Sequence, residues 1–184
     1  MPSNSRSQLE KWLKDIEVKG KVLDVGGVFM PIKGRTKTWE ASDYKILDIK
    51  PSRHSIIADY VYDVNEPIKL REEYDIVFCI EVMSHVWNPV QVMKNLHDFL
   101  VPDGTLYLSF HTLFPQHLAQ DSLRYTKKGI IKIMEKTDFI IWDIVPKIAA
   151  KPEVLHKFCK RESKVYENPG EIGYLVRVKR KTDG

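Results

Sequence analysis

Hydrophobic residues along this chain fall into short continuous runs separated by segments of helical periodicity. The runs predict buried strands at residues 21–25, 44–49, 55–58, 74–81, 105–110 and 139–145, and an alternating pattern predicts a last strand at 172–181. Apolar side chains spaced three or four positions apart predict helices at residues 7–17, 89–100 and 127–137. Because strands alternate with helices, the pattern indicates an α/β fold with a mostly parallel sheet.

Four segments break this pattern. Residues 28–43 contain Pro31 and Gly34 and show no helical periodicity, so they predict a loop with at most a short helix. The connection between the second and third predicted strands is too short for a helix. Residues 102–104 predict a turn, and the basic stretch at 147–164 predicts an irregular, solvated segment.

Length and composition favour one globular domain. The chain has 184 residues, of which 43% are hydrophobic and 29% charged. We expect an N-terminal helix within residues 1–20, a core at 21–145, and a basic segment with the last strand at 146–184. The net charge of +4 permits nucleic-acid binding without indicating it.

The cysteines and the N-terminal residues indicate the cellular compartment in which the protein is expected. Cys79 lies within an apolar run and far from Cys159, which suggests neither a disulfide nor a cysteine metal site. The N-terminus is polar, and no segment approaches the roughly 18 apolar residues of a membrane span. These features predict a cytoplasmic protein without membrane association. The histidine spacings predict no metal site.

Acidic residues stand at the ends of the predicted strands. Asp24 precedes Gly26 and Gly27, and further acids at strand ends are Asp48, Asp59 and Glu81. Parallel sheets bind ligands beyond the carboxyl ends of their strands, and an Asp after the second strand can accept hydrogen bonds from both hydroxyls of a ribose. The glycine pair lets a ligand approach the backbone. This arrangement predicts a nucleoside-containing cofactor.

The same segments resemble a known family, the class I S-adenosylmethionine-dependent methyltransferases of the type 11 group. The resemblance is carried in order by residues 22–27 (VLDVGG), 46–49 (ILDI), 74–86 (YDIVFCIEVMSHV) and 100–106 (LVPDGTL). A second pattern, shared with a subgroup, comprises His117, Asp121, Arg124-Tyr125-Thr126, Lys128-Gly129 and Phe139. The resemblance spans roughly residues 20–145 and implies a single-domain Rossmann-like fold whose mostly parallel sheet ends in an antiparallel C-terminal strand.

The resemblance implies S-adenosylmethionine as cofactor. Asp24, Gly26 and Gly27 would line the pocket near its methionine part, and Asp48 would bind the ribose hydroxyls. Asp59 resembles the acid near the adenine amino group, and Glu81 would face the methionine moiety. The third glycine usual after Gly27 is missing, so we expect reduced helices after the first two strands.

The resemblance further implies methyl transfer to a small-molecule or saccharide-type acceptor, with O-methylation expected. Methyl transfer from a sulfonium depends mainly on positioning, and a hydroxyl acceptor needs a base. His117 and His85 are the candidate bases. Asp121 is a candidate orienting residue for the base, and Asp121, Arg124 and Tyr125 are candidate substrate contacts.

Three alternatives remain open at this stage. The altered glycine turn is compatible with a non-catalytic binding module that kept the fold. A nicotinamide-type Rossmann enzyme would explain why Asp48 follows Gly27 by about 20 positions, but the Gly-x-Gly-x-x-Gly pattern is absent. An RNA methyltransferase would use the basic C-terminal segment, although aromatic RNA-binding motifs are lacking.

Overall fold

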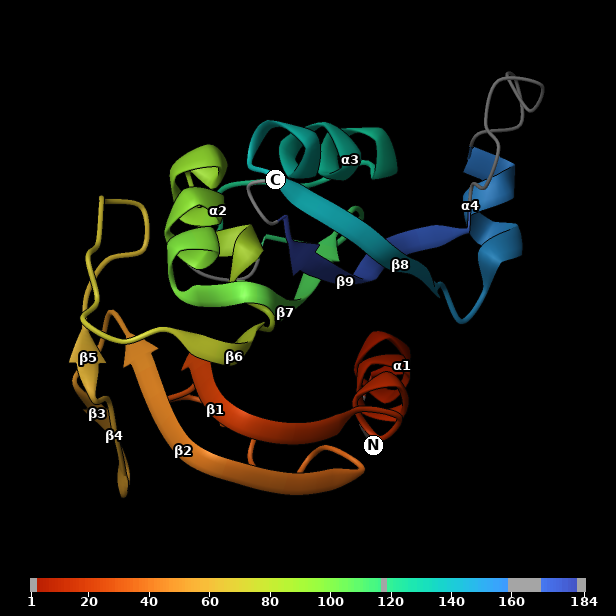
Figure 1. Cartoon of the computed structure of the whole chain (residues 1–184). Helices are drawn as coiled ribbons and strands as arrows, with labels where there is room; N and C mark the ends of the chain where they lie inside the picture. The colour runs from red at the N-terminus through yellow and green to blue at the C-terminus, as the bar shows by residue number, and fades with distance from the viewer. Residues whose placement is uncertain (1–2, 117–118, 159–169, 182–184) are drawn as a thin grey trace.

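A computed structural model describes residues 3–116, 119–158 and 170–181, and its centre is one seven-stranded sheet (Figure 1). The strands lie in the order β5-β2-β1-β6-β7-β9-β8, and β9 pairs antiparallel with both of its neighbours. The other pairs are parallel. The strand bounds are β1 Glu17–Val25, β2 Thr38–Asp48, β5 Tyr60–Val61, β6 Tyr74–Cys79, β7 Leu100–His111, β8 Phe139–Ile148 and β9 Glu171–Arg180. The predicted α/β class, with a mostly parallel sheet and an antiparallel last strand, is confirmed.

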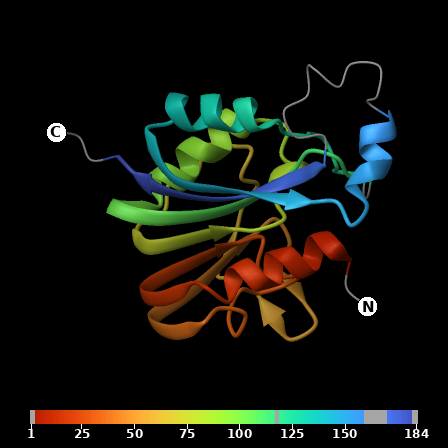
Figure 2. The ribbon, with the colours of Figure 1, turned by 90° about the vertical axis from the view of Figure 1, so that its right-hand side faces the viewer.

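Helices cover both faces of the sheet, as Figures 1 and 2 show. On one face, α2 (Pro89–Asp98) and α3 (Lys127–Lys136) pack over β6, β7 and β9. On the other face, α1 (Asn4–Leu13) packs against β1, β6 and β9. Each face has its own buried cluster, because the strands are apolar on both sides. None of the helices in the described ranges is long and apolar enough to cross a membrane.

The ends of the three packed helices follow from their capping residues. The Ser3 side chain accepts from the N–H of Arg6, and Asn88 precedes Pro89 at the start of α2. Thr126 caps α3 by accepting from the N–H of Gly129. The helix predicted at 7–17 therefore starts earlier, and it ends earlier because β1 already begins at Glu17.

The connections after the first two long strands contain no helix, as expected. Residues 26–37 form turns and bends, and the segment after β2 forms a small antiparallel hairpin of β3 (Ser52–Arg53) and β4 (Ile56–Ile57). The strand predicted at 55–58 is therefore wrong as a member of the main sheet. That place belongs to β5, which pairs with the end of β2.

Three further boundaries differ from the prediction. β2 begins at Thr38, inside the segment expected to be a loop, because residues 38–41 pair with β1. The turn expected at 102–104 is an irregularity within β7 between its pairings with Tyr74 and Ile76. β8 extends to Ile148 and is followed by α4 (Pro152–Phe158), so the basic segment is not irregular at its start.

Candidate functional site

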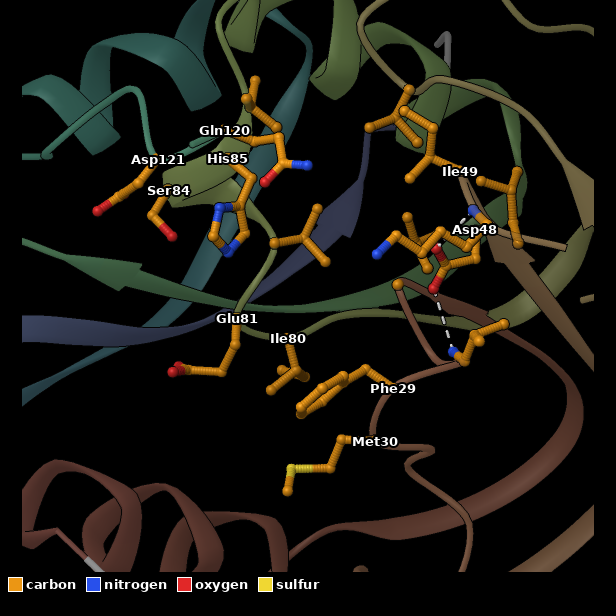
Figure 3. A pocket seen from close by; sticks show the side chains of 18 of the residues that line it. Phe29, Met30, Asp48, Ile49, Ile80, Glu81, Ser84, His85, Gln120 and Asp121 are labelled. Carbon is orange, nitrogen blue, oxygen red and sulfur yellow. Dashed lines mark hydrogen bonds between the residues drawn. The ribbon is translucent and has the colours of Figure 1, made fainter. Parts of the chain in front are cut away.

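A pocket of about 440 Å³ opens beyond the carboxyl ends of the parallel strands (Figure 3). Each of five neighbouring strands contributes a polar or small residue to its wall: Gly26 after β1, Asp48 on β2, Asp63 after β5, Glu81 after β6 and His111 on β7. This is the position in which open parallel sheets bind ligands. Of the residues predicted from the sequence, the structure brings Gly26, Asp48, Glu81, His85 and Asp121 together here.

Asp48 ends β2 on the pocket wall, where its two oxygens hold two loops. Oδ2 accepts a 3.1 Å hydrogen bond from the N–H of Val28, and Oδ1 accepts a 3.0 Å hydrogen bond from the N–H of Lys50. A carboxylate has about four acceptor positions, so each oxygen retains capacity for another donor. The side chain is thus fixed in orientation and still able to accept two ligand hydroxyls.

Apolar side chains form much of the remaining wall. Phe29 and Met30 come from the segment after β1, Ile49 follows Asp48, and Ile80 precedes Glu81 (Figure 3). Phe29 is 64% exposed and Ile49 is 61% exposed. Exposed apolar groups around a pocket are typical of a ligand-binding mouth.

Two contacts hold the segment that carries Phe29 and Met30. The guanidinium of Arg53 lies 3.5 Å from the centroid of the Phe29 ring, which joins the β3–β4 hairpin to this segment. Arg35 donates to the carbonyl of Met30 and forms an ion pair with Glu10 of α1. Side chains from α1 and from the hairpin thus support one wall of the pocket.

Gly26 occupies a position that excludes a side chain. Its φ is +82°, and a Cβ there would lie 2.4 Å from Cγ2 of Val82. Glycine accepts this left-handed conformation without penalty, whereas other residues do not. The turn after β1 can therefore lie directly against the segment after β6.

Asp24 lies beneath this turn and outside the pocket lining. Its Oδ2 accepts 2.7 Å hydrogen bonds from the N–H of Ile32 and from the hydroxyl of Tyr44. Burial raises the pKa of Asp24 to about 6, although these hydrogen bonds and the charge of Arg35 oppose the shift. Gly27 packs on the same carboxyl group, since a Cβ there would lie 2.6 Å from Oδ2 of Asp24. The structure thus gives both residues a place in supporting the turn.

The acid expected at the third strand end differs from the one that lines the pocket. Asp59 precedes β5, where it accepts from the N–H of Ile46 and pairs with Lys45. Asp63 follows β5 and lines the pocket, and its Oδ1 accepts from the backbone and side-chain N–H groups of Asn65. Asp63 was not among the predicted site residues, because the third strand of the main sheet is β5 and lies later in the chain than predicted. The signal was the apolar and aromatic run at 60–62 directly before it.

Glu81 belongs to a cluster of polar side chains at one side of the pocket. Its φ is +60°, in the left-handed region, and its carboxylate contacts Ser109 Oγ, His111 Nε2 and Lys147 Nζ at 2.7, 3.2 and 3.4 Å. Burial opposes ionisation, but the hydrogen bond from His111 and the charge of Lys147 hold the pKa of Glu81 well below its usual range. Lys147 is fully buried, so its assignment to a solvated segment was wrong.

The loop between β7 and α3 forms the far wall. Asp121 lines the pocket, and it accepts two hydrogen bonds from Arg124 at 2.6 and 2.5 Å. Arg124 also donates to the carbonyls of Phe114, Pro115 and Leu123. Its guanidinium thus ties this loop together, and it is not part of the pocket lining.

The remaining predicted acceptor-side residues are placed as follows. Tyr125 is buried, and its hydroxyl donates a 2.9 Å hydrogen bond to the carbonyl of Met83. His85 ends the short helix η1 (Met83–His85) and lines the pocket (Figure 3). His117 lies outside the described residues. Within the described ranges, no three His, Cys, Asp or Glu side chains are grouped so that they could hold a metal ion.

The chain is similar to a known family and to known proteins. Residues 3–140 match the family described as "Methyltransferase domain". The ubiquinone biosynthesis O-methyltransferase of Glaesserella parasuis is 26% identical over 109 residues, which are 56% of this chain and 40% of that protein. The chain therefore spans less than half the length of this relative.

Solved structures share the fold over nearly the whole chain. An S-adenosylmethionine-dependent methyltransferase from Mesorhizobium loti superposes with a TM-score of 0.64 at 12% identity, covering 96% of this chain and 98% of that one. The N-methyltransferase NodS of Bradyrhizobium japonicum, solved with S-adenosyl-L-homocysteine, gives a TM-score of 0.61 at 14% identity, covering 98% and 89%. These likenesses show that the chain shares the fold of these solved methyltransferases.

Proposed function

The chain belongs to the methyltransferase domain family, and on this premise we propose that it transfers a methyl group from S-adenosylmethionine to a hydroxyl of a small-molecule or saccharide-type acceptor. The observation that carries the proposal is Asp48. It stands on the pocket wall at the end of β2, with both oxygens oriented by backbone N–H groups and able to accept further donors.

The residues present fit the cofactor. A volume of about 440 Å³ is in the range of small-molecule and cofactor sites. In the proposed arrangement Asp48 accepts from the ribose hydroxyls, while Ile49 and Asp63 offer an apolar contact and an acceptor to the adenine. Gly26 and Glu81 lie towards the methionine end. We propose that Asp24, Gly27 and Asp59 act through the turns and strands that they hold.

The protein's contribution to the chemistry is positioning and the handling of one proton. The bound cofactor supplies an activated methyl group on a sulfonium, so the transfer requires an aligned acceptor more than chemical activation. The apolar side chains of Phe29, Met30 and Ile80 would limit the access of water to the reacting groups once a ligand covers them. A hydroxyl acceptor must also lose its proton, which requires a base on the acceptor side.

The acceptor half of the pocket lies along η1 and the loop before α3. His85 and Asp121 line it, and His117 stays a predicted base. Arg124 and Tyr125 are proposed to shape this half through Asp121 and Met83. The relative from Glaesserella parasuis is named as an O-methyltransferase, which supports oxygen as the accepting atom. The buried, unpaired Cys79 supports the prediction of a cytoplasmic location.

One observation favours a second candidate, a binding module without catalysis. The segment after β1 forms turns where the family pattern has a further glycine and a helix, and Phe29 and Met30 point their apolar side chains towards the pocket. Such a module would bind the cofactor or a related nucleoside and transfer no methyl group.

Incubation with methyl-labelled S-adenosylmethionine separates these functions. The acceptor panel contains phenols and catechols, saccharides, and RNA at two salt concentrations. Label in a phenol, catechol or saccharide is the expected result. Cofactor binding without transfer to any acceptor would favour the binding module, and label in RNA with strong salt dependence would favour the RNA alternative.

A further inference from the structure

A histidine that was not among the predicted bases is held by a carboxylate on the pocket wall. His111 ends β7, lines the pocket and is 6% exposed. Its Nε2 lies 3.2 Å from Oε2 of Glu81. The ring also packs against Phe114, with centroids 4.8 Å apart at a tilt of 34°. These two contacts fix the ring on both its edge and its face.

The carboxylate that holds His111 is itself held by side chains from β7 and β8. Ser109 Oγ donates to Glu81 Oε1 at 2.7 Å and accepts from the N–H of Glu81, also at 2.7 Å. On β8, Lys147 places its Nζ 3.4 Å from Oε1 of Glu81. Side chains from β7 and β8 thus hold a carboxylate that follows β6. Oε1 of Glu81 contacts Ser109 and Lys147, whereas Oε2 faces His111.

Gly173 on β9 makes the position of Lys147 possible. A Cβ there would lie 2.8 Å from Cε of Lys147 and 2.3 Å from the carbonyl oxygen of Phe110. A fully buried lysine beside a carboxylate is costly to maintain, and burial lowers its pKa. Its charge nevertheless favours the ionised form of Glu81, so Glu81 acts as a hydrogen-bond acceptor towards His111.

The protonation pattern of His111 follows from this partner. An ionised carboxylate only accepts hydrogen bonds, so the ring nitrogen facing it, Nε2, carries the hydrogen. In the neutral ring, Nδ1 then holds a free electron pair. This is the arrangement of a histidine base oriented by an acid.

We propose that His111 is the catalytic base of the methyl transfer and that Glu81 and Lys147 are its positioning residues; this rests on the function proposed above. The acceptor O–H gives its proton to Nδ1 of His111 while the oxygen forms the new bond to the methyl carbon. The carbon–sulfur bond breaks and its electron pair stays on sulfur, giving S-adenosylhomocysteine. The imidazolium then loses the proton to solvent.

Other charged groups near His111 are few among the described residues. Arg6 of α1 lines the pocket, and its positive charge contributes to lowering the pKa of Lys147. His85 at the end of η1 and Asp121 in the loop before α3 line the acceptor half. The charged and titratable groups that bear on the Glu81–His111 pair are thus Lys147 and Arg6, together with His85 and Asp121 on the pocket wall.

The test compares the wild type with His111→Gln, using the acceptor that the wild type methylates fastest. Gln keeps an N–H for Glu81 but has no Nδ1. We expect kcat at pH 7 to fall about 100-fold or more, with KM nearly unchanged. With a phenolic acceptor the deficit shrinks as pH rises, because the acceptor then ionises without a base. An equal deficit at every pH, or no deficit, overturns the proposal.

Two further proteins make the result specific. The double variant Glu81→Gln/Lys147→Met removes both charges together, so it leaves no unpaired buried ion, and we expect its kcat to lie between the wild type and His111→Gln. His54→Asn is the control, because His54 is exposed in the hairpin at φ +53° and Asn tolerates that conformation. Its kcat should equal that of the wild type.

A spectroscopic measurement is independent of turnover. Nitrogen-15 shifts of His111 in the neutral state should show hydrogen on Nε2 and none on Nδ1, and the opposite tautomer overturns the proposal. Calorimetry with S-adenosylhomocysteine should give His111→Gln nearly the wild-type affinity. If the folded wild type does not bind it, the proposed function fails, and the tautomer still decides whether the Glu81–His111 pair is assembled as described.

Discussion

The hydroxyl of Tyr44 donates a 2.7 Å hydrogen bond to Oδ2 of Asp24, joining β2 to β1 beneath the floor of the pocket. The same oxygen holds the N–H of Ile32, eight positions along the chain. Asp24 therefore fixes the path of the segment that replaces a helix after β1. Its effect on a ligand is indirect, through the turn at Gly26.

This buried acid should make stability depend on pH. The pKa of Asp24 is raised to about 6 by burial, so between about pH 4 and 6 the folded state binds more protons than the unfolded state. The contribution of Asp24 to stability is therefore largest at low pH and declines as pH rises through this window, by at most about 3 kcal/mol.

Denaturant unfolding of the wild type and Asp24→Asn across this pH range measures the contribution. The difference in unfolding free energy between them should change across the window and level off above about pH 6. Tyr44→Phe should move the window upwards, because it removes a hydrogen bond that lowers this pKa. A difference that stays constant from pH 4 to 7 would contradict the assignment.

Gly26 and Gly34 offer a matched pair of substitutions. Both have φ near +82°, but a Cβ at Gly26 would meet Val82 at 2.4 Å, whereas a Cβ at Gly34 meets nothing within 4 Å. Gly34→Ala should cost about 1 kcal/mol of unfolding free energy from backbone strain alone. Gly26→Ala should cost about 2–4 kcal/mol and weaken cofactor binding, because Val82 must move.

Val82→Ala in the Gly26→Ala background provides the check. It should recover part of the lost stability by removing the clash, while leaving the backbone strain. Equal costs for the two single alanine variants in urea unfolding would show that Val82 does not restrict this turn.

A substitution at Tyr125 distinguishes a structural role of this residue from direct contact with the substrate. Its hydroxyl donates to the carbonyl of Met83, and the side chain is 5% exposed. Tyr125→Phe should lower the unfolding free energy by about 1 kcal/mol, because the carbonyl loses its partner. We expect no change in the KM of the acceptor. A raised KM at unchanged stability would return Tyr125 to the substrate site.

The sequence predicted the long elements of this fold well, and the reason is physical. A run such as residues 74–79, in which every residue except Asp75 is buried, is typical of a central strand covered on both faces. β5 has two residues, too few for periodicity, so the third strand was placed at 55–58, in and just after the hairpin. Since Asp59 directly follows that predicted strand, Asp59 was predicted to line the pocket instead of Asp63.

The polar cluster on the pocket wall was beyond prediction for a different reason. Lys147 stands among basic residues in the sequence, and its burial depends on space left by Gly173 on another strand. His111 lies one position past the expected strand end, and only the pairing of β6 with β7 brings Glu81 to it and to Ser109. Contacts between strands that lie far apart in the sequence cannot be predicted from the local pattern of polar and apolar residues.

Calorimetric titration with S-adenosylhomocysteine tests the central claim most directly, using the wild type, Asp48→Ala and the control Asp98→Asn. Asp98 is on α2, with a 71% exposed side chain. We predict micromolar binding by the wild type and the control, about −8 kcal/mol, and a loss of about 10- to 100-fold for Asp48→Ala. Wild-type affinity in a folded Asp48→Ala protein, or no binding by the folded wild type, would contradict the account.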